Sequence, residues 1–367
     1  MAIRVPPAIG LVAHLVQGAQ RVATDPIAGT RAIPRSVAGL DAAYLSRLLG
    51  RSVTSVSVIG GDAGTSARTR LALSGRGVPD SVFVKMPART AATRLMGELG
   101  RLGETEVRFY SGLSAELSGV PRCYGATFDG LTGRYVLVLE DLPADECEFL
   151  DTLHPISPDQ AGLLVELLAR LHATFWGRVP SWVYSASGDD TSLLTGSLLK
   201  LSAKRLAERT SIPVGNGRFI DENYRAVAQL TDHPPHTVMH GDAHPGNVYF
   251  RNGAAGLLDW QAVRRGHPSR ELAYTLITGM TTEDRRTHQR DLLDQYRGAL
   301  AAAGGPELDR EELWTRYRQA AQYAYAAPVI TAGMGGMQDD GIALEGARRG
   351  VAALDDLDTV AVLRKHL

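Results

Sequence analysis

The chain has 367 residues, a formal net charge of −1 and 44% hydrophobic residues. This composition is typical of a soluble globular protein with one large or two moderate domains. The near-neutral charge gives no electrostatic reason to expect nucleic acid or an anionic membrane as a partner. The two cysteines, Cys123 and Cys147, form no CxxC pair, which favours reduced thiols in a cytoplasmic protein.

The first twenty residues contain one early arginine and a weakly apolar centre. Their prolines and histidine are poor material for the core of a signal peptide. The sequence contains no apolar run of the roughly 18 residues that a membrane span requires. We expect a surface helix or a mobile arm here, and we assign residues 1–50 to an N-terminal helical extension.

Predicted strands dominate the chain up to about residue 140. A short helix comes first, over residues 40–50, with Asp41 as its cap and Gly50 at its end. Residues 97–117 have helical periodicity. Strands are predicted from alternation and flanking turns over residues 52–61, 68–75 and 81–87, with two more within residues 119–142.

Helical periodicity dominates the remainder of the chain. Residues 157–177 predict a strong amphipathic helix, with Ser157 or Asp159 as its cap. A strand-rich part followed by a helix-rich part indicates an α+β protein with two lobes and a cleft between them. We therefore predict a small β-rich N-terminal lobe over residues 51–141 and a larger helical C-terminal lobe over residues 142–367.

Residues 240–259 combine oxygen-bearing side chains with a hairpin signal. The pair Asn252-Gly253 is a strong signal for a two-residue turn, and it lies between two short apolar strands. A hairpin brings its ends together, so we expect Asn247 and Asp259 to lie side by side. Asp242 lies in the loop that precedes the first strand.

These three side chains fit the chemistry of phosphoryl transfer. Asn and Asp supply hard oxygen ligands for Mg²⁺, which takes its other ligands from water and phosphates. A third carboxylate, set apart from the metal, can accept a proton from an attacking hydroxyl. This division predicts Asp242 as the base and Asn247 and Asp259 as the metal ligands.

The segment "HGDAHPGN" at residues 240–247 reproduces the His-x-Asp-x-x-x-x-Asn spacing of the protein-kinase catalytic loop. With the hairpin and the following "DW", it resembles the aminoglycoside phosphotransferase and choline-kinase-like family of the protein-kinase-like superfamily. The continuation "LLDWQAVRRGHPSRELAYTL" is similar to ecdysteroid-kinase-like members, with Glu271 at the acidic position of the next helix. The resemblance implies a bilobal kinase fold and ATP-dependent phosphorylation of a small-molecule hydroxyl, with GTP as the alternative donor.

The resemblance also implies a lysine that binds the nucleotide phosphates and a glutamate that orients it. Lys85 in the strand "VFVKMP" takes the first position. Glu106 in "ETEVRFY" takes the second, with Glu104 as the alternative. Mg-ATP would then bind between the two lobes.

Two further nucleotide contacts follow from the same resemblance. The turn "GGDAGTSARTR" lies where a glycine loop covers the phosphates, and the Gly64 backbone and Ser66 would donate to phosphate oxygens. The apolar strand "YVLVLEDL" leads into the hinge between the lobes. The adenine would pair with hinge backbone from Glu140 to Leu142.

Other functions were weighed against the kinase hypothesis. His236, His240 and His244 are spaced four apart and would hold zinc if they lay on a helix, but glycines and a proline break any helix here. A serine hydrolase is disfavoured because the sequence contains no GxSxG elbow. The second hypothesis is a catalytically silent nucleotide-binding protein on the kinase fold, although Lys85 and the three site residues are all present.

Several features stay open at this stage. His244 either braces its loop or approaches the acceptor or a phosphate. Arg264 and Arg265 are either solvated or in contact with phosphate. Residues 329–341 form either a mobile loop at the acceptor pocket or a connection between helices. The acceptor is a bulky alcohol or a polycation, and the protein is a monomer or a homodimer.

Overall fold

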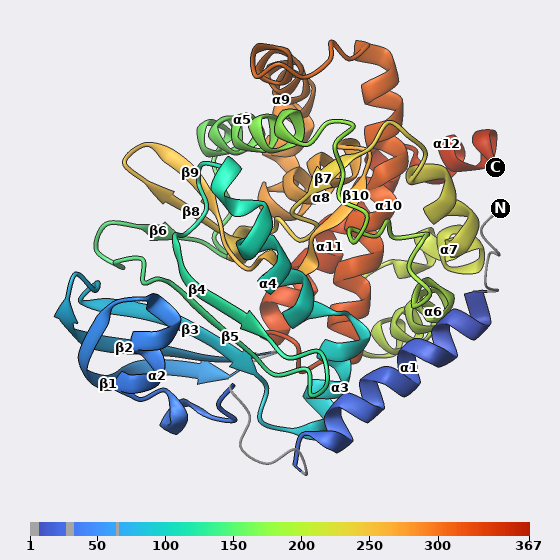
Figure 1. The fold of residues 1–367 in the computed structure, drawn as a ribbon. Coiled ribbons are helices and arrows are strands. Elements are labelled where there is room, and N and C mark those ends of the chain that lie inside the picture. The colour runs from blue at the N-terminus through green and yellow to red at the C-terminus, as the bar shows by residue number, and fades with distance from the viewer. Residues whose placement is uncertain (1–6, 27–32, 64–65) are drawn as a thin grey trace. The chain divides into compact units, whose positions relative to one another are not determined.

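The structure is a computed structural model that describes residues 7–26, 33–63 and 66–367. Contacts within the chain divide it into two compact units (Figure 1). The first unit consists of Met1–Ala115, Val120–Glu146 and Asp259–Ala262. The second unit consists of Glu116–Gly119, Cys147–Leu258 and Val263–Leu367.

A five-stranded antiparallel sheet with the order β1-β2-β3-β5-β4 forms the centre of the first unit. Its strands are β1 (Ser52–Ala63), β2 (Ser66–Arg76), β3 (Ser81–Pro87), β4 (Cys123–Phe128) and β5 (Tyr135–Glu140). In β3, Lys85 lies opposite Arg68 on one neighbouring strand and Leu137 on the other. The apolar run of β5 is buried, as a strand with neighbours on both sides requires.

The helices of the first unit are α1 (Pro7–Thr24), α2 (Ala42–Leu49), α3 (Ala91–Leu99) and α4 (Leu102–Gly112). In α2 the predicted ends are confirmed, because Asp41 accepts the Tyr44 N–H and Gly50 adopts φ +64°. The helical periodicity of residues 97–117 is divided in the structure between the end of α3, α4 and a short 3-10 turn at Ser114–Glu116. The chain breaks between α3 and α4 at Gly100 and Arg101, where Arg101 has φ +53°. Glycines spaced three apart weaken helix propensity around this break.

The second unit is mainly helical and contains two small sheets. Its helices are α5 (Pro158–Thr174), α6 (Ser192–Arg209), α7 (Arg218–Thr231), α8 (Ser269–Gly279), α9 (Thr282–Ala302), α10 (Arg310–Met334), α11 (Asp340–Asp356) and α12 (Thr359–His366). One sheet has the order β6-β8-β9, with β6 (Glu148–Phe149), β8 (Val248–Arg251) and β9 (Ala254–Leu257). The other pairs β7 (Thr237–Met239) with β10 (Arg264–Gly266). With the sheet of the first unit, this confirms the α+β class.

Local signals decide several boundaries in the second unit. Asn252 and Gly253 adopt φ values of +52° and +73° between β8 and β9, which is the geometry that the hairpin turn requires. Ser157, and not Asp159, caps α5, and it does so through a capping box with Gln160. Within residues 329–341, α10 ends and α11 begins, so this segment connects two helices.

Helix α8 is buried along its whole length and packs against α10. Burial on every side is typical of a helix at the centre of a domain. This position fixes the side chains that α8 directs at the loop before β8. Among the described residues, none of the helices combines the length and the apolar character of a membrane span.

Candidate active site

Three predicted residues of the first unit meet at a buried ion cluster. Lys85 Nζ lies 2.8 Å from Glu106 Oε1 and 2.7 Å from Oε2. The same Nζ lies 2.9 Å from Asp259 Oδ1. Strand β3 supplies the lysine and α4 supplies the glutamate. Glu104, the alternative partner, instead contacts Arg21 and Arg108.

The cluster holds one ammonium between two carboxylates. Burial alone would lower the pKa of Lys85, but Asp259 and Glu106 outweigh it and raise the pKa above its usual value. Burial raises the pKa of Glu106, although Lys85 opposes this effect. The lysine is therefore held in its charged form.

Asp259 occupies a backbone conformation that side chains seldom adopt, with φ +59°. Such conformations cost energy and are enriched at functional sites. The next residue, Trp260, stacks on Phe109 of α4 with ring centroids 4.0 Å apart and planes 6° apart. This stacking ties the segment that begins at Asp259 to the helix that carries Glu106.

Two of the other predicted nucleotide contacts, Ser66 and Glu140, lie at the ends of strands. Gly64 lies outside the described residues. Ser66 is the first residue of β2, is buried, and hydrogen-bonds with the Tyr135 hydroxyl. Glu140 ends β5, and its N–H donates to the Arg122 carbonyl at 2.7 Å, while Leu142 is half-buried just beyond.

In the second unit, the loop before β8 brings Asp242 and Asn247 together. Asn247 Nδ2 donates to the Asp242 carbonyl at 2.9 Å and lies 3.3 Å from Asp242 Oδ2. The Tyr274 hydroxyl donates to Asp242 Oδ1 at 2.9 Å. Burial and the charge of Asp242 raise the pKa of Tyr274, so this hydroxyl stays protonated and donates. One carboxylate is thereby held from two sides.

His240 joins the loop to the end of the hairpin. The Asp242 N–H donates to His240 Nδ1 at 3.2 Å, so the ring proton lies on Nε2. That nitrogen donates to the Leu258 carbonyl at 2.7 Å. The Leu258 N–H in turn donates to the Asn247 carbonyl at 2.8 Å, one residue before Asp259. His240 is thus a structural residue of the loop.

Glu271 of α8 anchors the backbone of this loop. Its carboxylate accepts the His240 N–H at 3.1 Å and the Gly241 N–H at 2.7 Å. His172 Nε2 lies 2.9 Å from the same carboxylate, and His172 Nδ1 lies 2.9 Å from the Tyr296 hydroxyl. A buried network from three helices therefore fixes the position of the loop.

A family model described as the phosphotransferase enzyme family matches residues 57–320, well over half of the chain. The chain belongs to this phosphotransferase family. No curated protein matches the chain by sequence. The family match confirms the predicted enzyme class, a small-molecule kinase with a hydroxyl acceptor.

Solved structures resemble the phosphotransferase at low identity. The GDP complex of a mutant aminoglycoside 2′-phosphotransferase IIIa aligns with TM-score 0.51 and 12% identity, over 84% of this chain and 93% of that chain. A putative aminoglycoside phosphotransferase from Ralstonia eutropha has TM-score 0.49 and 16% identity, with 83% and 92% covered. Choline kinase LicA from Streptococcus pneumoniae has TM-score 0.47 and 15% identity, with 84% and 94% covered. The first of these shows a shared fold alone. The predicted kinase-like fold and the predicted phosphotransferase family are confirmed. The ecdysteroid-kinase-like resemblance stays a prediction.

The histidines of the phosphotransferase loop do not converge. His236 Nε2 lies 2.5 Å from the Asp232 carbonyl. His244 Nδ1 accepts the Gly246 N–H at 3.1 Å, and its Nε2 lies 3.8 Å from Asp242 Oδ2. Across the described residues, no group of three or more His, Cys, Asp or Glu side chains is placed to hold a metal ion. The zinc hypothesis therefore has no support in the arrangement of these histidines.

Arg264 and Arg265 of the phosphotransferase lie on β10, opposite Met239 and Val238 of β7. Arg264 reaches Asp189 at 3.9 Å, and the Arg265 N–H donates to the Tyr184 carbonyl at 3.0 Å. Both arginines are half-buried next to β7, the strand that leads into residues 240–247. A role in phosphate binding stays a prediction.

Sequence reasoning missed the tyrosines that contact the phosphotransferase loop. Tyr274 follows Glu271 by three residues on α8, so helical spacing alone could have placed both on one face. Tyr323 of α10 donates to the Gly241 carbonyl at 3.1 Å, and its ring lies 5.0 Å from that of Tyr274. Its position far along the chain leaves no local signal for this contact.

The anchoring role of Glu271 in the phosphotransferase gives a pH-dependent prediction. Burial would raise the pKa of Glu271, but His172, His240 and the Gly241 N–H outweigh it and lower the pKa below the usual 4.5. The charged carboxylate therefore stabilises the fold above that value, and this contribution is lost as the pH falls through the folded-state pKa. We expect Glu271→Gln to have a lower free energy of unfolding than wild type at neutral pH. This difference between the two proteins should become smaller as the pH falls.

Urea unfolding from neutral pH down to about pH 3 measures this gap. Glu283→Gln, an exposed change on α9, is the matched control and should show a small gap at every pH. A stability gap for Glu271→Gln that stays constant with pH would argue against an ionised, anchoring Glu271.

Proposed function

We propose that the protein is an ATP-dependent kinase that transfers the γ-phosphoryl group to a hydroxyl of a small molecule. The observation that carries the proposal is the ion cluster in which Lys85 contacts Glu106 at 2.8 Å and Asp259 at 2.9 Å. A buried lysine held by a helix glutamate is the arrangement that positions nucleotide phosphates in kinases. The GDP complex of the aminoglycoside phosphotransferase supports a purine nucleotide donor and keeps GTP as the alternative.

Lys85 would bind the α- and β-phosphates. Its ammonium is charged and is held at both sides by carboxylates, so little conformational freedom is lost when phosphate binds. Glu106 fixes the direction of the ammonium from α4. We propose the backbone from Glu140 to Leu142, Ser66 and the Gly64 backbone as the contacts for the rest of the nucleotide.

The donor set at Asn247 and Asp259 fits Mg²⁺. Asn247 turns its amide nitrogen towards Asp242, so its Oδ1 faces the opposite side of the amide. Asp259 contacts Lys85 through Oδ1, and carboxylate oxygens are hard ligands of the kind that Mg²⁺ prefers. The Leu258 N–H donates to the Asn247 carbonyl at 2.8 Å, which fixes the backbone of Asn247 within the second unit. When bound, Mg²⁺ would neutralise charge on the β- and γ-phosphates.

Asp242 would act as the base. The acceptor oxygen attacks the γ-phosphorus, the bond to the β-phosphate oxygen breaks, and the hydroxyl proton passes to the Asp242 carboxylate. Tyr274 and Asn247 hold this carboxylate in one orientation, so it meets the hydroxyl without reorganising. The Glu271 network fixes the backbone that carries it.

Two Asp-Asp pairs in the C-terminal part of the chain, Asp339-Asp340 and Asp355-Asp356, bear on the acceptor class. Asp340 is paired with Arg209 at 2.9 Å, and Asp356 is paired with Arg286 at 2.7 Å and with Arg285. Carboxylates already neutralised by arginine attract a polycation weakly. We therefore propose that a partly apolar alcohol is the better acceptor, in keeping with the ecdysteroid-kinase-like resemblance.

A screen for ADP release tests the proposed function. Purified protein is mixed with Mg-ATP and with one compound from each of five classes: sterols, macrolides, sugars, choline and aminoglycosides. We expect acceptor-dependent ADP release for at least one bulky alcohol, with a matching phosphorylated product by mass spectrometry. Nucleotide binding with no turnover of any compound would favour the catalytically silent alternative.

Replacing the phosphate lysine gives a direct check of the nucleotide site. We expect Lys85→Ala to raise the KM for ATP by about tenfold or more, the effect of a lost hydrogen bond to a charged group. The variant also removes the buried ion pairs that Lys85 forms with Glu106 and Asp259, so its unfolding temperature should fall. Lys204→Ala, at an exposed position on α6, is the control and should keep wild-type KM. Full activity in Lys85→Ala would place the phosphate lysine elsewhere.

A further inference from the structure

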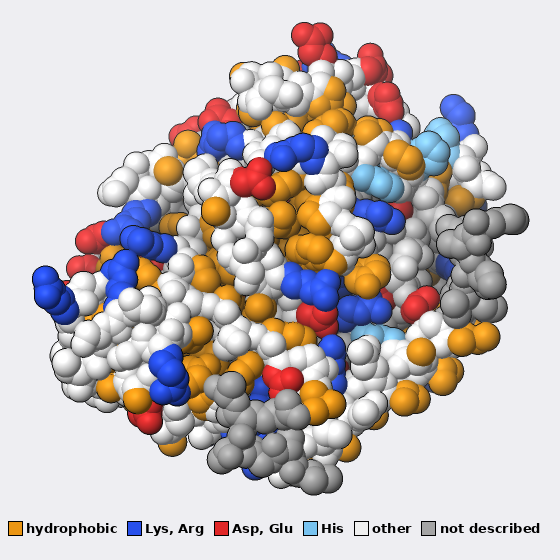
Figure 2. Space-filling model, in the orientation of Figure 1, with side chains coloured by type: hydrophobic (Ala, Val, Ile, Leu, Met, Phe, Trp, Pro, Cys, Tyr) orange, Lys and Arg blue, Asp and Glu red, His pale blue; other side chains and the backbone are white. Residues whose placement is uncertain are grey.

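Helix α1 packs against the helical part of the first unit, although it lies outside residues 57–320 that the family model covers. A methyl group added at Gly18 would lie 3.2 Å from Glu98 Cβ, so α1 and α3 approach closely there. His14 Nε2 lies 2.9 Å from the carbonyl of Leu99 at the end of α3. The outward face of α1 exposes Ile9, Val12 and Val16, and Figure 2 shows hydrophobic side chains along this helix.

Arg21 on the inward face of α1 connects three segments. Its guanidinium lies 2.9 Å from Glu98 on α3 and 3.1 Å from Glu104 on α4. Its Nε donates to the Gly130 carbonyl, in the turn between β4 and β5, at 3.0 Å. The arginine is buried, so these contacts are shielded from solvent screening.

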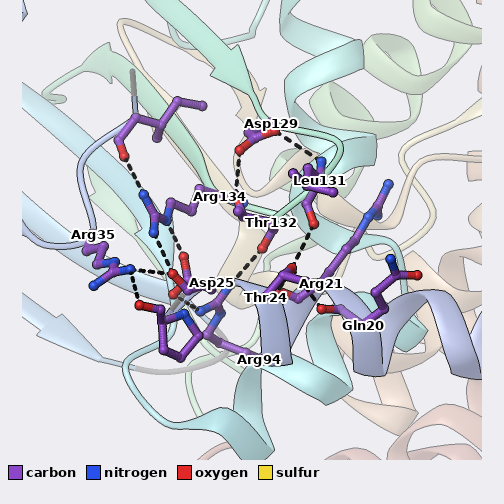
Figure 3. A network of polar contacts seen from close by, with 12 residues as sticks. Gln20, Arg21, Thr24, Asp25, Arg35, Arg94, Asp129, Leu131, Thr132 and Arg134 are labelled. Carbon is purple, nitrogen blue, oxygen red and sulfur yellow. Dashed lines mark hydrogen bonds and ion pairs between the residues drawn. The ribbon is translucent and has the colours of Figure 1, made fainter. Parts of the chain in front are cut away.

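Asp25, just after α1, forms a second set of buried ion pairs. It lies 2.6 Å from Arg94 on α3 and also accepts from Arg134 before β5. Figure 3 shows both arginines directed at this carboxylate. Burial would raise the pKa of Asp25, but hydrogen bonds from Arg134 and Arg94 outweigh it and lower the pKa. A charged Asp25 thus fixes the end of α1 on the same elements as Arg21.

The helix that receives the Arg21 contact is the one that positions the nucleotide lysine. Glu104 lies in the first turn of α4, two residues before Glu106. The helix follows Arg101 at φ +53°, where a capping Ser, Thr, Asp or Asn would otherwise stabilise its start. Toward its other end, Phe109 stacks on Trp260. Contacts from outside therefore hold α4 at both ends, with Glu106 between them.

We propose that α1 is a brace for α4, and that Arg21 and Asp25 are positioning residues that hold Glu106 against Lys85. The inference rests on the proposed role of Lys85 and Glu106 in binding nucleotide. It assigns a role in nucleotide binding to a segment that the family model does not cover. A brace of this kind makes nucleotide affinity depend on residues that never touch the nucleotide.

A double-mutant cycle on the full chain tests the brace. The dissociation constant for AMP-PNP with Mg²⁺ is measured for wild type, Arg21→Gln, Glu106→Gln and the double variant. We expect each single change to weaken binding about fivefold or more, the usual size of coupling between linked sites. The double variant should bind no more weakly than Glu106→Gln alone, because Arg21 acts through Glu106. Arg218→Gln, which breaks an exposed pair on α7, is the control.

The cycle separates the brace from a merely structural role. Additive losses in the double variant, or wild-type affinity in Arg21→Gln, would overturn the inference while the proposed function stands. Wild-type affinity in Glu106→Gln would instead overturn the proposed nucleotide site, and the brace with it. If Arg21→Gln does not fold, as judged by its unfolding transition, Glu104→Gln breaks the same contact from α4 and leaves the pair between Arg21 and Glu98 in place.

Discussion

Asp242→Asn should lower kcat by about 10²- to 10⁴-fold, the contribution of a positioned general base. The amide has nearly the same shape as the carboxylate, but it cannot take the hydroxyl proton. Tyr274 and Asn247 would still contact the side chain, so the loop should keep its position. Because Asp242 is proposed to contact the acceptor hydroxyl, and neither the nucleotide nor the metal, we expect the affinity for Mg-ATP to change little.

The measurement is a comparison of kcat with nucleotide affinity, using the acceptor that the screen identifies. A drop in kcat with an unchanged dissociation constant for Mg-AMP-PNP identifies an interaction made only in the transition state. Asp291→Asn, an exposed change on α9, controls for the loss of one negative charge. An unchanged rate in Asp242→Asn would remove Asp242 as the base.

Asp259→Asn should abolish the dependence of nucleotide binding on Mg²⁺. The substitution removes the charge that would hold the cation and weakens the pair with Lys85, at 2.9 Å in the wild type. Asparagine is chosen because it tolerates the left-handed backbone at φ +59°, which alanine would strain. Any loss of binding then reports the missing carboxylate, with little contribution from a distorted loop.

Thermal unfolding with and without Mg-ATP checks this expectation. A ligand present at 100 times its dissociation constant stabilises the folded state by about 2.7 kcal/mol, so the wild-type shift should be large. In Asp259→Asn, the rise in unfolding temperature caused by Mg-ATP should be no larger than the rise that ATP with EDTA causes in wild type. A full-size shift in the variant would show that the metal ligand lies elsewhere.

Sequence signals were reliable where neighbouring residues decide the structure. The turn at Asn252-Gly253, the cap at Asp41 and the apolar strand that carries Lys85 all follow from backbone preferences and short-range hydrogen bonds. The motif spacing also placed Asp242 and Asn247 on one loop, where their side chains meet. The helical periodicity of residues 97–117 did not show the break between α3 and α4, because propensity does not reveal where a chain must turn to pack.

The choice between Glu106 and Glu104 shows what local signals cannot decide. Both glutamates lie in α4, two residues apart, and the sequence offers either as the partner of Lys85. Packing of α4 directs Glu106 to the buried lysine, while Glu104 contacts Arg21 of α1. The outcome depends on which face of the helix meets the sheet, and that is set by contacts distant in sequence.

The amino-acid sequence by itself determined the residue types and spacing of the proposed site: Lys85 upstream, then Asp242, Asn247 and Asp259 in the order of a kinase. Only the tertiary structure decided what holds them, namely Tyr274 on Asp242, Glu271 on the loop backbone and α1 on α4. The physical reason is the separation of the interacting residues along the chain. Turns and caps form between neighbours, whereas a buried ion pair joins residues as distant as Lys85 and Asp259, 174 positions apart, once packing has removed water from both.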